Sequence, residues 1–136
     1  MDEIDKKIIH ILKQDGRATY NEIGKKVGLS EGAVRKRIKD LMDSGVIKKF
    51  TLKLGLAEGA EAIALVSVKP SIPTSEISAE LLKIPYVESV YEVTGEYDIA
   101  IMISAMNIAE VNECIERIRK IEGIVNTNTM IVLRSW

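Results

Sequence analysis

The sequence predicts an α+β fold made of two small domains: an N-terminal helix-turn-helix domain and a C-terminal βαββαβ domain. Three amphipathic helical patterns with start signals occupy the first 45 residues, and strand and helix patterns alternate in the rest of the chain. Charge divides the chain in the same way, because residues 1–53 contain 13 Lys/Arg and 8 Asp/Glu, whereas residues 54–136 contain 6 and 12. A basic part joined to an acidic part is expected when one of them binds a polyanion.

The composition, 46% hydrophobic and 29% charged, is that of a globular protein. No apolar run reaches the roughly 18 to 20 residues that cross a bilayer, and the opening MDEIDKK lacks the cationic-then-apolar order of a secretory signal. We therefore expect a cytoplasmic location and no membrane partner. Cys114 is the only cysteine, and the helical pattern around it favours a buried or half-buried side chain.

The segment DEIDKKIIHILKQDG predicts the first helix, because its apolar residues recur at helical spacing: Ile4, Ile8, Ile11 and Leu12. His10, the only histidine, lies about 200° around this helix from Ile8 and therefore faces solvent. A single exposed histidine without a second candidate ligand is expected to be a surface residue, neither a catalytic base nor a metal ligand.

Two further helix starts lie 11 residues apart. Thr19 and Glu22 can form a capping box, in which each side chain satisfies a free amide at the helix start, and Ser30 is a good N-cap for the next helix. The interval leaves room for about two turns of helix and a tight connection through Gly28. This spacing predicts a helix-turn-helix whose second helix stops at Gly45.

That second helix separates its apolar and basic residues. Its apolar stripe consists of Val34, Ile38 and Leu41. At about 100° per residue, four residues point to the opposite side: Gly32, Arg35, Lys36 and Lys39. Arg37 lies on the flank of the stripe, where it can brace the fold, contact a phosphate or read a base.

We interpret the basic side as a DNA-binding surface rather than an ordinary solvated helix face. It carries no carboxylate between Glu31 and Asp40, and Gly32 near its start allows close approach of a duplex. Lysine and arginine bind phosphates, and arginine also reads guanine edges in the major groove. The predicted contacts to double-stranded DNA are Ser30, Glu31, Gly32, Arg35, Lys36, Arg37 and Lys39. Further phosphate contacts are expected from Lys25, Lys26, Lys48, Lys49 and Lys53.

After Gly45, the alternation in VIKKFTLKLG (residues 46–55) predicts a strand and connector, which would make the first domain winged-helix-like. The glycines and small residues of GLAEGAEA mark a boundary. We therefore expect a DNA-binding domain at residues 1–50, a linker at 51–61 and a second domain at 62–136.

The second domain has strand and helix patterns in the order βαββαβ: IALVSVKP, PTSEISAELLKI, VESVYEV, DIAIMIS, IAEVNECIERIRKI and IVNTNTMIVL. This domain contains an internal sequence repeat at an offset of 37 residues, in which Lys83 and Ile84 align with Lys120 and Ile121. The order predicts a ferredoxin-like (ACT-like) sandwich, with one sheet and both helices on the same face.

One face of this sheet is then left without a cover. The strand DIAIMIS places three isoleucines on one side and Ala100, Met102 and Ser104 on the other, so both faces are largely apolar. Another subunit or a ligand must cover the open face. We expect at least a homodimer, which also suits DNA binding, because two recognition helices about 34 Å apart read two half-sites.

The turn VTGEYD, residues 93–98, is the second candidate site. Gly95 permits a positive φ, and the carboxylates of Glu96 and Asp98 can accept hydrogen bonds from an ammonium group. An ordinary β-turn remains the alternative. Thr127 and Thr129 add hydroxyl groups on the last strand, with a position in the sheet that the pattern leaves open.

Over essentially its whole length the chain resembles the leucine-responsive and asparagine-operon (feast/famine) regulators. The resemblance rests on the opening Asp-x-x-Asp, the GLS turn, and VTGEYD followed by DIAIMIS and the Thr-x-Thr strand, together with the helix-three pattern Val34, Arg37, Ile38, Leu41, Gly45, Val46 and Ile47. It implies a transcription regulator built from dimers, often four to a ring (an octamer), with an effector, typically an amino acid, bound where neighbouring sensing domains meet. Carried over by position, the effector residues would be Gly95, Glu96, Tyr97 and Asp98, with Thr127 and Thr129 nearby.

We therefore expect a sequence-specific DNA-binding transcription regulator that responds to an amino acid or a related metabolite. One alternative is an architectural DNA-binding protein without an effector. A second is an enzyme, or an enzyme's stand-alone ligand-binding regulatory subunit. No Cys/His pair, glycine-rich phosphate loop or metal-ligand spacing in the sequence supports catalysis, so we expect no enzymatic activity, no metal and no cofactor.

Overall fold

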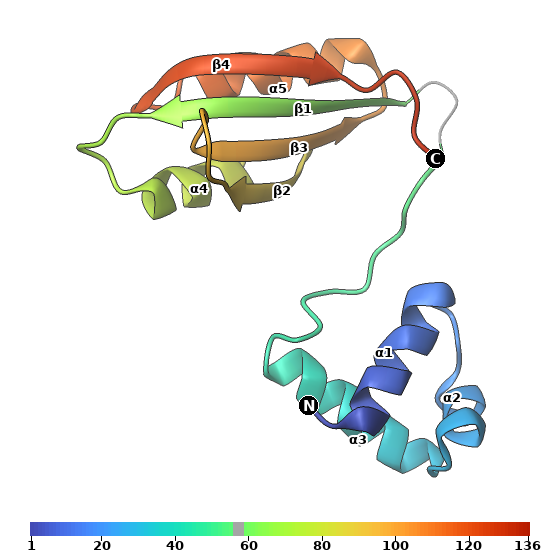
Figure 1. Ribbon diagram of the computed structural model, residues 1–136. Coiled ribbons are helices and arrows are strands. Elements are labelled where there is room, and N and C mark those ends of the chain that lie inside the picture. The colour runs from blue at the N-terminus through green and yellow to red at the C-terminus, as the bar shows by residue number, and fades with distance from the viewer. Residues whose placement is uncertain (56–58) are drawn as a thin grey trace. The chain divides into compact units, whose positions relative to one another are not determined.

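The computed structural model describes residues 1–55 and 59–136, which form two compact units, residues 1–53 and 54–136 (Figure 1). The first unit contains helices α1 (Glu3–Gln14), α2 (Tyr20–Val27) and α3 (Glu31–Asp43). The second contains β1 (Ala60–Val68), α4 (Thr74–Leu82), β2 (Val87–Glu92), β3 (Ile99–Ala105), α5 (Ile108–Arg119) and β4 (Ile124–Ile131). The predicted α+β class and the order of elements in the second domain are confirmed.

The three N-terminal helices begin where their capping residues predict. Asp2 and Thr19 each form a complete capping box, with Asp5 and Glu22 as the partners three residues on. The Ser30 hydroxyl oxygen accepts a hydrogen bond from the Ala33 amide at 3.1 Å. The helices pack around buried residues of all three elements, namely Ile8, Ile23, Val34 and Ile38.

The turn between α2 and α3 depends on two glycines. Gly28 has a left-handed backbone (φ 75°), and its amide donates a hydrogen bond to the Gly24 carbonyl at 2.8 Å. The Leu29 amide donates to the same carbonyl at 3.0 Å. Gly24 is buried within α2, and a Cβ atom on it would overlap the Leu29 carbonyl oxygen. A side chain at position 24 is therefore incompatible with this close return of the chain.

The strand predicted within residues 46–55 is wrong, because the backbone of this segment is irregular. A strand requires a neighbour to pair its N–H and C=O groups, and the first unit, in its described residues, contains only helices. The alternating side chains of Phe50, Leu52 and Leu54 are exposed.

The predicted linker, residues 51–61, also needs a correction at its end. Ala60 and Glu61 belong to β1, because Ala60 is buried in the core and pairs with Ala105 of β3. Residues 56–58, in the middle of the predicted linker, lie outside the described residues.

The second unit is a four-stranded antiparallel sheet with the strand order β2-β3-β1-β4. Helices α4 and α5 cover one face, as predicted (Figure 1). The core between them includes Ile99, Ile101 and Ile103 of β3 and the buried Cys114 of α5. Burial raises the pKa of the Cys114 thiol.

The internal repeat is visible in the backbone. Ile84 and Ile121 lie two residues after α4 and α5, and their amides donate the same type of hydrogen bond, to the carbonyls of residues 81 and 118 at 3.1 and 3.2 Å. Two positions later, Tyr86 (φ 74°) and Gly123 (φ 103°) both have a left-handed backbone. The two repeats therefore make the same turn, with glycine at the left-handed position in the second repeat and tyrosine at that position in the first.

The uncovered face of the sheet is apolar at its centre, as predicted. Directly paired residues of neighbouring strands share a face of the sheet. Ile63 pairs with Met102 of β3 and Met130 of β4, and Leu65 pairs with Ala100 of β3.

Among the described residues, no helix is long and apolar enough to cross a membrane.

Candidate nucleic-acid interface and ligand site

Helix α3 presents its cations outward because its opposite stripe is buried. Val34, Ile38 and Leu41 are 0%, 3% and 4% exposed. The side chains on the other side are largely in solvent, with exposed fractions of 61% for Arg35, 77% for Lys36 and 72% for Lys39.

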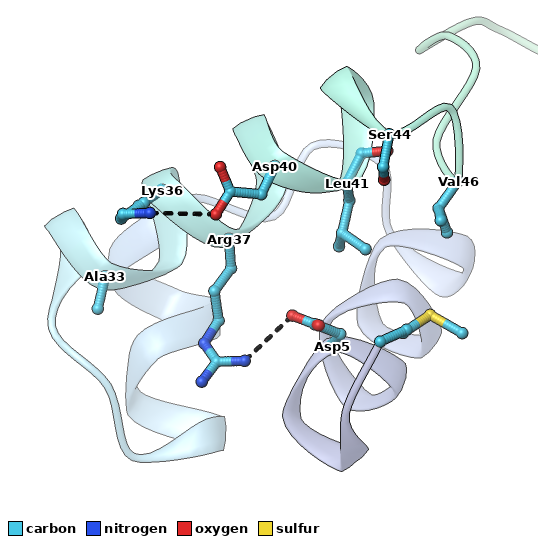
Figure 2. A pocket seen from close by; sticks show the side chains of 9 residues that line it. Asp5, Ala33, Lys36, Arg37, Asp40, Leu41, Ser44 and Val46 are labelled. Carbon is cyan, nitrogen blue, oxygen red and sulfur yellow. Dashed lines mark hydrogen bonds and ion pairs between the residues drawn. The ribbon is translucent and has the colours of Figure 1, made fainter.

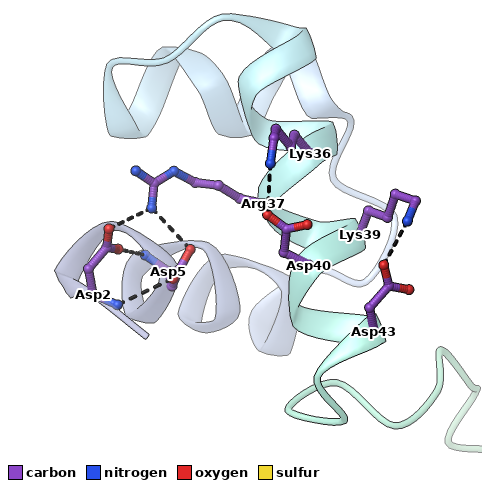
Figure 3. Close-up of polar contacts among 7 residues, drawn as sticks. All are labelled: Asp2, Asp5, Lys36, Arg37, Lys39, Asp40 and Asp43. Atoms are coloured by element: carbon purple, nitrogen blue, oxygen red, sulfur yellow. Dashed lines mark hydrogen bonds and ion pairs between the residues drawn. The ribbon is translucent and has the colours of Figure 1, made fainter.

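Each of these three cations has a carboxylate partner one turn away on the same helix. Arg35 pairs with Glu31 at 2.9 Å, Lys36 with Asp40 at 3.2 Å and Lys39 with Asp43 at 2.6 Å. Figure 3 shows the two lysine pairs side by side along α3. The hydrogen bond from Lys39 to Asp43 raises the pKa of Lys39. Exposed pairs of this kind contribute little stability, so these cations can exchange their carboxylate partners for another anion at a small cost in free energy. The four-residue spacing of the partners is a sequence signal from which these pairs could have been predicted.

Arg37 points elsewhere, toward the start of α1. Its guanidinium donates hydrogen bonds to the carboxylates of Asp2 at 2.7 Å and Asp5 at 3.2 Å (Figure 3). These are the two residues of the α1 capping box, and the Arg37 side chain is 30% exposed. Of the roles that the sequence left open for Arg37, bracing the fold is the one its contacts fit.

The same contacts border a hollow of about 490 Å³ between α1 and α3. Figure 2 shows the ion pair of Arg37 and Asp5 at this hollow, with Lys36 and Asp40 paired beside it. Every one of these charges already has a partner of opposite sign, so the hollow belongs to the packing of α1 on α3.

The pair of Arg37 and Asp2 predicts an acid-dependent loss of stability. The hydrogen bond from Arg37 is the main cause of the lowered pKa of Asp2, whose ordinary value is 3.8. A carboxylate with a lowered folded-state pKa stabilises the fold above its unfolded pKa, and this contribution is lost as the pH falls through the folded value. We expect Asp2→Asn, which keeps the N-cap, to lower the Tm at pH 7 and to approach the wild type below pH 3.8, as measured by circular dichroism.

The matched control is Glu3→Gln, which removes a carboxylate from the same helical turn but leaves the Arg37 contacts in place. Among the contacts of the described residues, Glu3 pairs with Lys6 of its own helix alone, at 2.8 Å. A smaller change in Tm is expected for this variant. Equal Tm values for Asp2→Asn and the wild type at pH 7 would contradict the stabilising role of the pair.

The start of α3 holds the other predicted DNA contacts. Ser30 and Glu31 already have partners within the domain, the Ala33 amide and Arg35. Apart from its chain neighbours and the backbone of α3 itself, no described residue has an atom within 4 Å of the place where a Cβ on Gly32 would lie, so packing inside the domain does not require glycine there. The lysines expected to contact phosphates, Lys25, Lys26, Lys48, Lys49 and Lys53, are all exposed.

The structure adds one residue that the sequence did not indicate. The guanidinium carbon of Arg35 lies 5.3 Å from the centroid of the Tyr20 ring, within cation–π range. Tyr20 is the first residue of α2 and is 37% exposed. No local pattern points to this contact, because it depends on the angle between α2 and α3.

The second candidate site, the loop between β2 and β3, is fastened by Asp98. The Asp98 amide donates to the Val66 carbonyl and its own carbonyl accepts from the Val93 amide, both at 2.9 Å. Its carboxylate accepts a hydrogen bond from the Val68 amide at 2.8 Å, next to the bulge in β1. Asp98 therefore attaches the loop to β1.

The remaining loop residues and the two threonines have defined positions. Gly95 has the positive φ expected of it, 110°, Glu96 is exposed and Tyr97 is half-buried. Thr127 pairs with Val66, and Thr129 pairs with Ala64 on the helix-covered face. Asp98 and Thr127 thus flank Val66 from opposite sides of β1, and Thr129 lies two residues farther along.

This combination of a helix-turn-helix and a βαββαβ domain defines a class of protein, the helix-turn-helix transcription regulators that carry a ligand-binding domain. The sequence profile of the AsnC-type helix-turn-helix domain matches residues 1–42, and that of the Lrp/AsnC ligand binding domain matches residues 61–136. The chain belongs to the Lrp/AsnC family of transcription regulators, as its sequence resemblance predicted.

Individual relatives agree with this assignment over the full chain. The HTH-type transcriptional regulator LysM of Saccharolobus solfataricus is 47% identical over 136 residues, covering 100% of this chain and 96% of the relative. The crystal structure of the leucine response regulatory protein LrpA of Mycobacterium tuberculosis has a TM-score of 0.84 at 27% identity, covering 100% and 94%. A feast or famine regulatory protein of the same organism, complexed with L-methionine, has a TM-score of 0.80 at 28% identity, covering 99% and 93%.

Proposed function

We propose that this transcription regulator binds specific operator DNA through the outer side of α3 and changes its DNA binding when an amino acid or a related metabolite binds the second unit. The observation that carries the DNA part is the outward presentation of Arg35, Lys36 and Lys39 opposite a buried stripe. Because its target is DNA, we place the regulator in the cytoplasm, and we assign it no enzymatic activity.

The α3 residues have separate roles in this proposal. Arg35, Lys36 and Lys39 contact bases and phosphates, and Gly32 lets the helix start approach the duplex. Ser30 and Glu31 organise the helix start and lie next to the DNA. Arg37 acts through its contacts with α1, which set the position of the recognition helix.

The proposed effector site is the loop Gly95, Glu96, Tyr97 and Asp98 together with Thr127 and Thr129. The complex of a structural relative with L-methionine supports an amino acid as the effector. The exposed Glu96 carboxylate suits the ammonium group of such a ligand, and the threonine hydroxyls can donate to its carboxylate. Asp98 keeps the loop in the required shape.

We also propose that the regulator is a homodimer, and that four dimers can assemble into an octamer. The apolar open face of the sheet supports the dimer, because a second copy of the same face would remove it from water. A dimer also supplies two α3 helices, which two half-sites about 34 Å apart require.

The effector site predicts a ligand-dependent rise in melting temperature. Screening the twenty amino acids against the full chain should identify at least one that raises the Tm, by roughly 10–20 °C at a concentration 100 times its Kd. The Asp98→Ala variant should lose this response and the effector-dependent change in DNA binding, because the carboxylate that accepts a hydrogen bond from the Val68 amide and holds the loop in shape is removed. Its DNA binding without effector should match that of the wild type.

The matched control is Glu76→Ala, which removes an exposed carboxylate from the first turn of α4. This variant should keep the full Tm response. Calorimetry that finds unchanged effector affinity for Asp98→Ala would contradict the assignment of the loop. If none of the amino acids raises the Tm of the wild type, an architectural DNA-binding protein becomes the better description.

A further inference from the structure

We propose that Tyr20 is a positioning residue for DNA recognition: together with Glu31 it holds the Arg35 guanidinium in place to read a guanine. This inference rests on the proposed entry of α3 into the major groove. It adds a specificity-determining residue on α2 to a set of base-contacting residues that otherwise all lie on α3.

Arg35 has partners from two elements. The Tyr20 ring at the start of α2 lies 5.3 Å from its guanidinium carbon, and Glu31 on α3 accepts a hydrogen bond from its Nη2 at 2.9 Å. The electron-rich face of the ring attracts the cation, while the carboxylate accepts a hydrogen bond from one of its donors. Partners on two helices restrict the side chain more than either does alone.

The other α3 cations differ from Arg35 in this respect. Lys36 and Lys39 each pair with one aspartate of their own helix. Arg37 is engaged by Asp2 and Asp5 of α1. Among the described contacts of these four cations, Arg35 alone combines outward exposure with a second partner from another helix.

This arrangement suits base reading more than phosphate binding. A guanidinium can donate two parallel hydrogen bonds to the N7 and O6 atoms of guanine, but this needs a defined orientation. Holding the side chain in that orientation before binding lowers the entropy cost of the contact. The adjacent Glu31 carboxylate can accept from the cytosine amino group, so Arg35 and Glu31 together match the donor and acceptor pattern of a G·C pair.

The cluster is also accessible to a duplex. The Arg35 side chain is 61% exposed and Glu31 is 56% exposed, while Tyr20 remains 37% exposed beside them. The Tyr20 ring therefore supports the guanidinium without enclosing it, and the exposed part of the Arg35 side chain remains available to a duplex.

The test is a selection from a library of randomised DNA duplexes with the full-length protein and its variants. The wild type should select half-sites with one guanine that Arg35→Ala no longer prefers, at a cost of roughly 5- to 150-fold in affinity for the wild-type site. Tyr20→Leu should weaken the preference for the same guanine by about 2- to 5-fold, the factor expected from an exposed cation–π contact. Tyr20→Phe, which keeps the ring, should retain the wild-type preference.

A double-mutant comparison separates positioning from direct contact. If Tyr20 acts through Arg35, Tyr20→Leu has no further effect on affinity in the Arg35→Ala background. An equal loss in both backgrounds, or an unchanged guanine preference in Tyr20→Leu, would overturn the proposal. A wild-type protein that selects no consensus would instead contradict the proposed function itself, and circular dichroism distinguishes both results from unfolding.

Discussion

Replacing Arg35, Lys36 and Lys39 together with Ala is expected to abolish operator binding and to leave oligomerisation intact. The three side chains supply the cations on the outer side of α3, and a phosphate that no cation neutralises keeps its condensed counterions. The logarithmic dependence of affinity on salt should therefore become shallower by about one unit for each phosphate that the variant no longer neutralises.

The triple variant should still fold. The three side chains are exposed, their ion pairs lie within α3, and Ala is a better helix former than the residues it replaces. The buried stripe of Val34, Ile38 and Leu41 is unchanged. A helical circular dichroism spectrum and an unchanged elution volume in size-exclusion chromatography would confirm that the loss of binding is local.

A second triple variant provides a matched control in the other unit. Lys83, Arg117 and Arg119 are exposed, and each pairs with a glutamate of its own helix or helix end, at 3.0, 3.6 and 3.3 Å. Changing them to Ala removes the same charge from the chain, and operator affinity should remain near the wild-type value. A footprint of the α3 triple variant on its own promoter at moderate salt would show that the recognition helix has been assigned wrongly.

Local features of the fold could be predicted because their signals lie within a few residues of one another. The capping box of Thr19 and Glu22 and the N-cap at Ser30 mark helix starts regardless of what packs against them. The strand predicted within residues 46–55 shows the limit of local reasoning. Its alternation was compatible with a strand, but a strand also needs a pairing partner, and alternation carries no information about one.

The candidate sites likewise combine features that the local sequence predicts with features that depend on tertiary structure. The outward direction of Arg35 followed from helical geometry, whereas its contact with Tyr20 depends on the crossing of two helices. The face of Thr127 could not be assigned, because it depends on the register between β4 and β1, which shifts at the bulge between Ser67 and Val68. The role of Asp98 as an attachment point likewise required the position of the Val68 amide.

The substitution expected to affect stability most is Gly24→Ala. Gly24 lies inside α2, where Ala would ordinarily be favoured by about 1 kcal/mol. Here the added Cβ would overlap the Leu29 carbonyl oxygen, a backbone atom that cannot rotate away. Overpacking of this kind costs about 1–3 kcal/mol or more, a large fraction of the stability of a small domain. We expect a lower unfolding midpoint of the first unit in urea and weaker DNA binding, because the α2–α3 turn must open.

Gly32→Ala is the matched control for this prediction, since both glycines lie in helices of the same motif. In the described part of the chain, no atom beyond the α3 backbone and the neighbouring residues lies within 4 Å of the Cβ position at Gly32, so Ala should stabilise the domain by about 0.5–1 kcal/mol. If the start of α3 approaches the duplex closely, the same methyl group should weaken operator binding in spite of the higher stability. The two variants then separate two reasons for glycine in one motif: packing against the chain's own turn at position 24 and close approach to DNA at position 32. Equal unfolding midpoints for Gly24→Ala and the wild type would show that the turn can move aside at no cost.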